Sequence, residues 1–260
     1  MNKFLISMTY IVTVSFLPLA HGSLIVTDGL VAAYELNGNT NDSSGNHFDG
    51  VAHGASPTQD RFGNQRGAYS FNGINNYIEL PTAAIGGWNE LTLSVWVNAP
   101  EYNGNSWPPF FGSYAGNAAF NDNLGVWKNT DRLHFEIITT DGNFYGLGEL
   151  EIPWDEWFHV ALVYDGSTLT EYINGVQGKV VSASGTLLPT TELFLGKYHS
   201  DNTGFLNGSL DDAFIYNRAL STEEIGQLTN YSSVPEPTTL VLLGVALLGL
   251  GFTRQKTICR

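Results

Sequence analysis

The chain has 260 residues, of which 43% are hydrophobic, 13% aromatic and only 14% charged. This balance is typical of a packed globular protein and excludes a disordered chain. The chain has 11 Lys and Arg and 25 Asp and Glu, which gives a formal net charge of -14. A nucleic-acid-binding protein is disfavoured, because binding to phosphates needs clustered positive charge. The single cysteine, Cys259, excludes an intrachain disulfide and a zinc site built on several cysteines.

The first 22 residues have the pattern of a secretory signal peptide. Lys3 precedes an apolar run over residues 4–19, and the small residues Ala20 and Gly22 occupy positions -3 and -1 before Ser23. A retained transmembrane anchor is the alternative, but the polar residues and the proline within this short run disfavour it. We predict a signal helix over residues 1–22 and export of the rest of the chain.

Residues 23–233 form one predicted domain, because neither a linker nor an internal repeat interrupts them. The stretch from Ser23 to Glu236 contains seven Lys and Arg and all 25 acidic residues, which gives a net charge of -18. Such a field repels anionic polymers at low salt and favours divalent cations. The exported part is therefore expected to meet neutral polymers more readily than acidic ones.

Strand signals recur along this domain. Apolar and polar residues alternate over residues 91–97, and similar runs cover residues 133–139, 159–164, 168–173, 192–195 and 209–216. The pairs Asp141-Gly142, Asp165-Gly166 and Asn174-Gly175 suit type I′ hairpin turns. One short helix is predicted after Ser221, which forms a capping box with Glu224. The sequence thus predicts an all-β, two-sheet antiparallel sandwich.

The order of several segments resembles the laminin G-like (LamG-like) jelly-roll domains of the concanavalin A-like lectin and glucanase superfamily. The matching segments are residues 29–46, 61–63, 68–73, 77–78, 157–161, 172–175, 195–196, 207–212 and 215–221. The resemblance covers nearly the whole exported domain and implies a jelly-roll sandwich. It does not select a function, because this fold carries lectins, glycosidases, adhesins and structural modules.

The resemblance also implies that a calcium ion joins the N- and C-terminal edges of the fold. Asp42 and Asn46 lie in a polar loop and offer oxygen ligands, and Asp211 on the late strand would complete the shell. The alternative is a loop whose side chains cap their own backbone, with backbone amides or Arg218 as partner of the strand acid. Strand alternation puts Asp211 and Asp212 on opposite faces, and we assign the ligand role to Asp211.

The sequence offers little for catalysis. Glu149 and Glu151 share one face of a predicted strand, but they lack the Glu-x-Asp-x-x-Glu spacing of the related glucanases. His159 lies between Phe158 and Val160 in a strand and is expected to be a buried histidine rather than a base. We therefore predict a protein that is not an enzyme, with a glycoside hydrolase or lyase using Glu149 and Glu151 as the alternative.

A loop-rich aromatic segment is the candidate for carbohydrate binding. Flat rings pack against the C–H groups of neutral sugars, and a neighbouring amide can bind their hydroxyls. The alternative is that these rings plug the core beneath the loop. The predicted sugar-binding residues are Tyr102, Asn105, Trp107 and Tyr114.

The last 27 residues, 234–260, resemble the PEP-CTERM sorting signal of exported bacterial proteins. Val234-Pro235-Glu236-Pro237 is followed by an apolar run over residues 238–253 and by a basic end that begins at Arg254. As a helix, this run would be about 24 Å long, which is short for a membrane span. The resemblance implies transient anchoring in the inner membrane of a Gram-negative bacterium and processing by an exosortase-type enzyme. A simple tail anchor is the alternative.

Together these features predict an exported module that binds a neutral polysaccharide or serves as a component of the cell envelope or exopolysaccharide matrix. A protein-binding adhesion domain is a further alternative. The glycan, the processing site and the oligomeric state cannot be inferred from the sequence.

Overall fold

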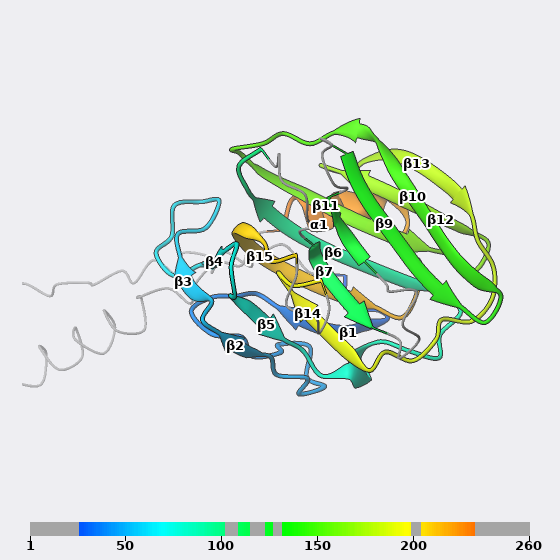
Figure 1. Cartoon of the computed structure of the whole chain (residues 1–260), viewed down its shortest axis with the longest axis horizontal. Helices are drawn as coiled ribbons and strands as arrows, with labels where there is room; N and C mark the ends of the chain where they lie inside the picture. The colour runs from blue at the N-terminus through cyan, green and yellow to red at the C-terminus, as the bar shows by residue number, and fades with distance from the viewer. Residues whose placement is uncertain (1–25, 102–108, 115–122, 127–131, 199–203, 232–260) are drawn as a thin grey trace, which may run out of the picture.

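The structure is a computed structural model of the whole chain (Figure 1), and it describes residues 26–101, 109–114, 123–126, 132–198 and 204–231. The predicted signal peptide and sorting tail lie outside these residues, as do Tyr102, Asn105 and Trp107 of the predicted sugar-binding segment. Within the described residues, no helix has the length and apolar character needed to cross a bilayer.

The described chain is built almost entirely of strands, as the sequence predicts. Among the described residues, the single α-helix, α1, spans Thr222–Thr229, and one 3-10 turn covers Thr82–Ala84. The strands are β1 (Leu30–Tyr34), β2 (Val51–His53), β3 (Ser56–Thr58), β4 (Ala68–Asn72), β5 (Tyr77–Glu79), β6 (Leu91–Asn98), β7 (Pro109–Tyr114), β8 (Asn123–Val126), β9 (Arg132–Thr139), β10 (Gly142–Glu151), β11 (Trp157–Tyr164), β12 (Thr168–Ile173), β13 (Val176–Ser182), β14 (Glu192–Leu195) and β15 (Asn207–Tyr216).

The strands form two antiparallel sheets that pack face to face (Figure 1). The eight-stranded sheet has the order β13-β12-β11-β6-β15-β4-β3, and β1 pairs with β15 beyond the end of β4. The seven-stranded sheet has the order β10-β9-β8-β7-β14-β5-β2. Neighbours along the chain often lie in different sheets, so the predicted jelly-roll sandwich is confirmed.

Alternation of side chains places the main core between the two sheets. Leu93 and Val95 of β6, Phe135 of β9 and Leu193 and Leu195 of β14 are almost completely buried in this core. Their neighbours along each strand therefore point to the outer faces. The two outer faces are the places where the fold can present side chains to other molecules.

The outer face of the eight-stranded sheet is covered by α1 and by both ends of the described chain. Val26, Ile225, Leu228 and Tyr231 share a second apolar cluster with outward residues of this sheet such as Phe214. The predicted capping box is confirmed, because the Ser221 hydroxyl accepts the Glu224 N–H and the Glu224 carboxylate accepts the Ser221 N–H. The helix therefore starts where the sequence predicts.

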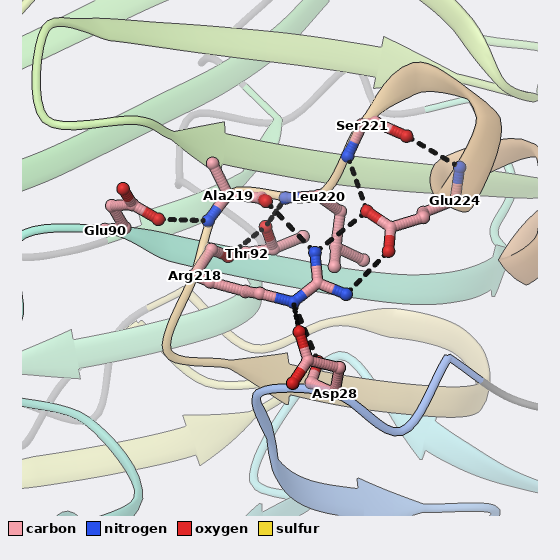
Figure 2. A network of polar contacts seen from close by, with 8 residues as sticks. All are labelled: Asp28, Glu90, Thr92, Arg218, Ala219, Leu220, Ser221 and Glu224. Atoms are coloured by element: carbon pink, nitrogen blue, oxygen red, sulfur yellow. Dashed lines mark hydrogen bonds and ion pairs between the residues drawn. The ribbon is translucent and has the colours of Figure 1, made fainter.

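Arg218 joins the start of α1 to the N-terminal end of the domain (Figure 2). Its guanidinium donates to both carboxylate oxygens of Glu224, at 2.8 and 2.6 Å, and its Nε lies 2.9 Å from the Asp28 carbonyl oxygen. The Asp28 carboxylate lies 3.2 Å from the same Nε. Arg218 is thus fully engaged here and does not neutralise the acids of β15.

The three predicted hairpin turns differ in geometry. Only Asn174 and Gly175 both have the positive φ of a type I′ turn, at 51° and 77°. The predictions for the other two pairs are wrong: Gly166 alone has positive φ in a three-residue loop, and Gly142 is already paired with Thr139 in the β9–β10 ladder. The Asp165-Gly166 pair lies in a loop that is longer than a type I′ turn, and the turn between β9 and β10 ends before Gly142. Both pairs are therefore found at hairpins, but not as the two central residues of a type I′ turn.

Candidate functional site

Asp42 organises the polar loop that follows β1. Its Oδ1 accepts the N–H groups of Ala33 and Ser44, each at 2.9 Å, and its Oδ2 accepts the Ser44 hydroxyl at 2.8 Å and the Phe48 N–H at 3.0 Å. Burial alone would raise the pKa of Asp42, but these hydrogen bonds outweigh it and lower the pKa below its usual range. The carboxylate is therefore ionised and carries a full set of protein donors.

Asn46 lies in the same loop but its amide serves the backbone. The Asn46 Nδ2 donates to the Val31 carbonyl oxygen at 2.9 Å, and the residue is exposed. The loop is thus closed onto β1 by side-chain hydrogen bonds, in the manner of the backbone-capping alternative.

Asp211 and Asp212 form a buried ionic cluster with Arg61. The guanidinium Nη1 of Arg61 contacts the Asp211 Oδ2, and its Nη2 lies 2.6 Å from the Asp212 Oδ2 and 2.5 Å from the Tyr231 carbonyl oxygen. The side chain of Arg61 is 5% exposed, and those of Asp211 and Asp212 are 2% and 0% exposed. Both acids thus have a cationic partner, but it is Arg61 and not Arg218.

A β-bulge explains why both acids reach the same arginine. The β15 register against β6 shifts between Asp211 and Phe214, and Asp212 has a φ of 45°. The bulge breaks the strict alternation, so the prediction that Asp211 and Asp212 lie on opposite faces is wrong.

Burial raises the pKa of both carboxyl groups, and the neighbouring charge of Asp212 raises that of Asp211 further. Arg61 opposes both shifts.

The described contacts do not assemble the predicted calcium shell. Asp42 and Asn46 bond to the backbone around β1, whereas Asp211 bonds to Arg61. In the part of the chain that the structure describes, no group of three or more His, Cys, Asp or Glu could hold a metal ion. These residues, as they are arranged, do not fit a calcium ion.

Tyr114, the described member of the predicted sugar-binding set, lies on the outer face of the seven-stranded sheet. It is paired with Glu192 of β14, and both alternate with the buried residues Ser113 and Leu193. Tyr114 and Glu192 are partly exposed, and the Oε2 of Glu192 is a buried oxygen without a hydrogen-bond partner in the described structure. An aromatic side chain and a carboxylate thus stand side by side on this face.

A second aromatic group occupies the β2–β5 corner of the same face. His53 stacks on Tyr77 with ring centroids 4.4 Å apart, and the Lys197 Nζ lies 4.5 Å from the ring centroids of both Tyr77 and Phe194. The His53 Nε2 also lies 3.1 Å from the Glu79 carboxylate. The corner presents rings and hydrogen-bonding groups together, which is the combination that sugar binding requires.

Two polar residues on β9 were not among the residues predicted from the sequence. His134 and Glu136 alternate with the buried Leu133, Phe135 and Ile137, so both belong to the outer face of the seven-stranded sheet. They are 3% and 8% exposed, and burial lowers the pKa of His134 to about 4. The alternation within residues 133–137 is visible in the sequence and could have identified them.

Glu149 and Glu151 point to different cations. The Glu149 carboxylate lies 2.7 Å from the Lys179 Nζ of β13, and Glu151 lies 3.9 Å from the Arg132 guanidinium of β9. Both acids are well exposed, and the β10 register shifts between Leu147 and Glu151. The two acids that the enzymatic alternative would use as a pair thus lie beside different cations.

His159 is a buried histidine, as predicted. Its Nε2 lies 2.7 Å from the Ser94 hydroxyl and its Nδ1 lies 3.3 Å from the Thr229 hydroxyl. Burial, with a smaller effect of the Arg61 charge, lowers its pKa to about 3. The imidazole is therefore neutral and links β11, β6 and α1.

Comparison with known families identifies the class of the protein. The family model described as the concanavalin A-like lectin/glucanases superfamily matches residues 71–226, more than half of the chain. The chain belongs to this family. A PEP-CTERM protein-sorting motif matches residues 233–255, which implies export and sorting to the cell envelope with processing by an exosortase. No curated protein matches the chain.

Several solved structures share the fold of this chain at low sequence identity. Domain 4 of AbnA, a GH43 extracellular arabinanase from Geobacillus stearothermophilus, in complex with arabinotriose, is 23% identical, with a TM-score of 0.62 over 77% of this chain and 98% of that domain. The binding domain of Paraclostridial Mosquitocidal Protein 1 is 19% identical, with a TM-score of 0.63 over 78% of this chain. The botulinum neurotoxin serotype D/C binding domain is 14% identical, with a TM-score of 0.61 over 78% of this chain. The match spans about half the length of each toxin domain.

Proposed function

We propose that residues 23–233 form a non-enzymatic module that binds a neutral polysaccharide of the cell envelope or extracellular matrix of a Gram-negative bacterium. Residues 1–22 act as the signal peptide, and residues 234–260 anchor the chain transiently in the inner membrane until processing. The contact surface for the glycan is the outer face of the seven-stranded sheet, with Tyr114 as its described aromatic residue. Tyr102, Asn105 and Trp107, which lie outside the described residues, are also proposed to contact the glycan.

One observation carries this proposal: the two outer faces of the sandwich are unequal. On the eight-stranded sheet, α1 and the residues at both ends of the described chain cover the outward side chains. Among the described residues, no helix covers the seven-stranded sheet, whose outer face carries Tyr114, Glu192 and the His53–Tyr77 stack. A face with rings beside carboxylates suits sugars, whose C–H groups stack while their hydroxyls donate hydrogen bonds.

The position of the chain ends supports the same choice of face. Tyr231, which precedes the sorting tail by two residues, is packed on the eight-stranded sheet, with its ring 5.5 Å from that of Phe214. The last described residue of the domain thus lies on the sheet opposite the proposed binding face.

Comparison with arabinanase domain 4 supports a carbohydrate ligand, because that domain was solved with arabinotriose bound. Likeness to toxin binding domains supports a second candidate, a protein-binding adhesion module. The strongly acidic surface favours a neutral ligand in either case.

A glycan array probed with the full chain in detergent tests the proposal, followed by assay of the bound polymer for new reducing ends. We expect binding to neutral glycans without release of shortened products. Shortened products would replace the proposal with the hydrolase, and capture of a protein without any glycan would replace it with the adhesion module.

A further inference from the structure

We propose that Arg61 is an internal cation that takes the place of the predicted calcium ion, so that the domain folds without a divalent metal. The proposal is independent of which polymer the module binds. It rests on the way in which each predicted calcium ligand is already engaged by a group of the protein itself.

The N-terminal half of the predicted shell is closed by hydrogen bonds. Both carboxylate oxygens of Asp42 accept two donors each, and three of these four donors are backbone N–H groups. Calcium would have to displace them, since an ionised carboxylate has about four acceptor positions in all. Unsatisfied N–H groups of Ala33 and Phe48 in this 7% exposed site would then oppose metal binding.

The C-terminal half is filled by a guanidinium. Arg61 contacts one oxygen from each of Asp211 and Asp212, as a cation bridging two carboxylates does. The rings of Phe62 and Trp96 lie 4.5 and 4.6 Å from its Cζ, so aromatic groups flank the charge. A second cation beside this one would be repelled at short range.

Arg61 also performs the cross-linking that the calcium was predicted to perform. Its partners Asp211 and Tyr231 are 150 and 170 residues away in the sequence. One side chain thus ties the segment before β4 to β15 and to the last described residue of the domain. The Tyr231 hydroxyl bonds in turn to Glu35, 3.2 Å away at the end of β1, so the N-terminal edge is included.

Two carboxylate oxygens mark the place where a metal would have to bind if the proposal were wrong. The Oδ1 atoms of Asp211 and Asp212 are buried and lack a hydrogen-bond partner in the described structure. Two oxygens beside a guanidinium fall short of the six to eight ligands that calcium takes. We therefore expect these oxygens to remain without calcium even at millimolar concentration.

The consequence is a fold that does not depend on the calcium level of its compartment. Such a domain would have the same stability before export, where free calcium is scarce, and outside the cell. Thermal unfolding of the full chain in detergent, followed by circular dichroism in millimolar calcium or in EDTA, tests this directly. We expect the same melting temperature in both, whereas a site with a Kd a hundredfold below free calcium would raise it by about 5–10 °C.

Substitutions at Arg61 provide the second arm. We expect R61Q, which removes the charge, to lower the melting temperature strongly or to prevent folding, and R61K, which keeps the charge but cannot bridge two carboxylates, to lower it less. The matched control is R66Q, because Arg66 is exposed and its Nη2 bonds to the Gly38 carbonyl oxygen, 3.2 Å away. A calcium-dependent rise in the wild-type melting temperature would overturn the proposal, as would an R61Q protein as stable as R66Q.

Discussion

Glu171 is a carboxylate inside the sandwich, at the end where β10 and β13 meet. It is fully buried, and its Oε1 accepts the backbone N–H groups of Glu149 at 2.7 Å and Lys179 at 2.9 Å. A Cβ atom at Gly148 or at Gly178 would lie 2.1 Å from a Glu171 carboxylate oxygen, so the glycines make room for it. The side chain thus joins the edges of the two sheets.

We expect Glu171→Ala to lower the free energy of unfolding by about 2–4 kcal/mol, because it leaves buried N–H groups of both sheets without an acceptor. Glu171→Gln keeps the accepting oxygen and is expected to cost less. Gly148→Ala introduces the clash directly and should also destabilise. Urea denaturation of the full chain measures all three, and an alanine variant within about 0.5 kcal/mol of wild type would contradict the assigned role.

His159 makes stability depend on pH. Its pKa falls from 6.5 to about 3 on folding, because burial and the Arg61 charge disfavour the imidazolium. The unfolded chain therefore binds the proton more readily, so the contribution of His159 is complete above pH 6.5 and is lost as the pH falls toward 3. Comparison with His159→Asn separates this effect from those of the buried acids.

The destabilisation caused by His159→Asn, measured by urea unfolding, is expected to be about 2 kcal/mol smaller at pH 5 than at pH 7. Thr222→Ala, at the opposite end of α1 from the Thr229 contact of the imidazole, serves as the control and should show a constant effect across this range. A His159→Asn effect that is equally constant would show that the imidazole is not buried in its neutral form.

At the scale of elements, α1 depends on its first turn. Replacement of Ser221 by Ala removes one side of the capping box and should cost about 1 kcal/mol. Glu224→Ala should cost more, because the same carboxylate also binds Arg218, which is anchored to Asp28 (Figure 2). Gln227→Ala, at an exposed position of the same helix, is the control. Equal melting temperatures for the Glu224 and Gln227 variants would contradict the proposed link between α1 and the N-terminal end.

The elements that could be predicted are those whose signal is local. The capping box needs only residues 221–224, and the strands over residues 91–97 and 159–164 can be predicted from alternation or from an apolar run. The bulge at Asp211 and Asp212 could not be predicted in this way, since it arises from the pairing of β15 with several strands. The contact of Arg61 with Asp211, across 150 residues, was equally inaccessible because it needs the assembled sheet. The candidate site shows the same limit. Tyr114 was predicted from the sequence as a sugar-binding residue, but its pairing with Glu192 could not be predicted because it needs the assembled sheet.

At the scale of the whole molecule, the sandwich has one face that holds both ends of the described chain and one that presents rings and acids. The apolar clusters on either side of the eight-stranded sheet fix the first face. The second face is proposed to bind a neutral polysaccharide. The central claim is that the two faces have these different roles. It predicts that substitutions of exposed residues on the seven-stranded sheet weaken binding, whereas those on the eight-stranded sheet leave it unchanged, and that both have little effect on folding.

The most direct test is cosedimentation of the full chain with the polysaccharide that the glycan array selects, using Tyr114→Ala and His53→Ala on the seven-stranded sheet and Val180→Ala on the eight-stranded sheet. Val180 is 43% exposed and is the matched control. Truncation of an aromatic contact to a sugar should cost about 1–2 kcal/mol, or roughly a tenfold loss of affinity, in at least one of the first two variants, and none in the third. Undiminished binding by both seven-stranded-sheet variants, together with a loss in Val180→Ala, would place the binding surface on the wrong side of the molecule for this account.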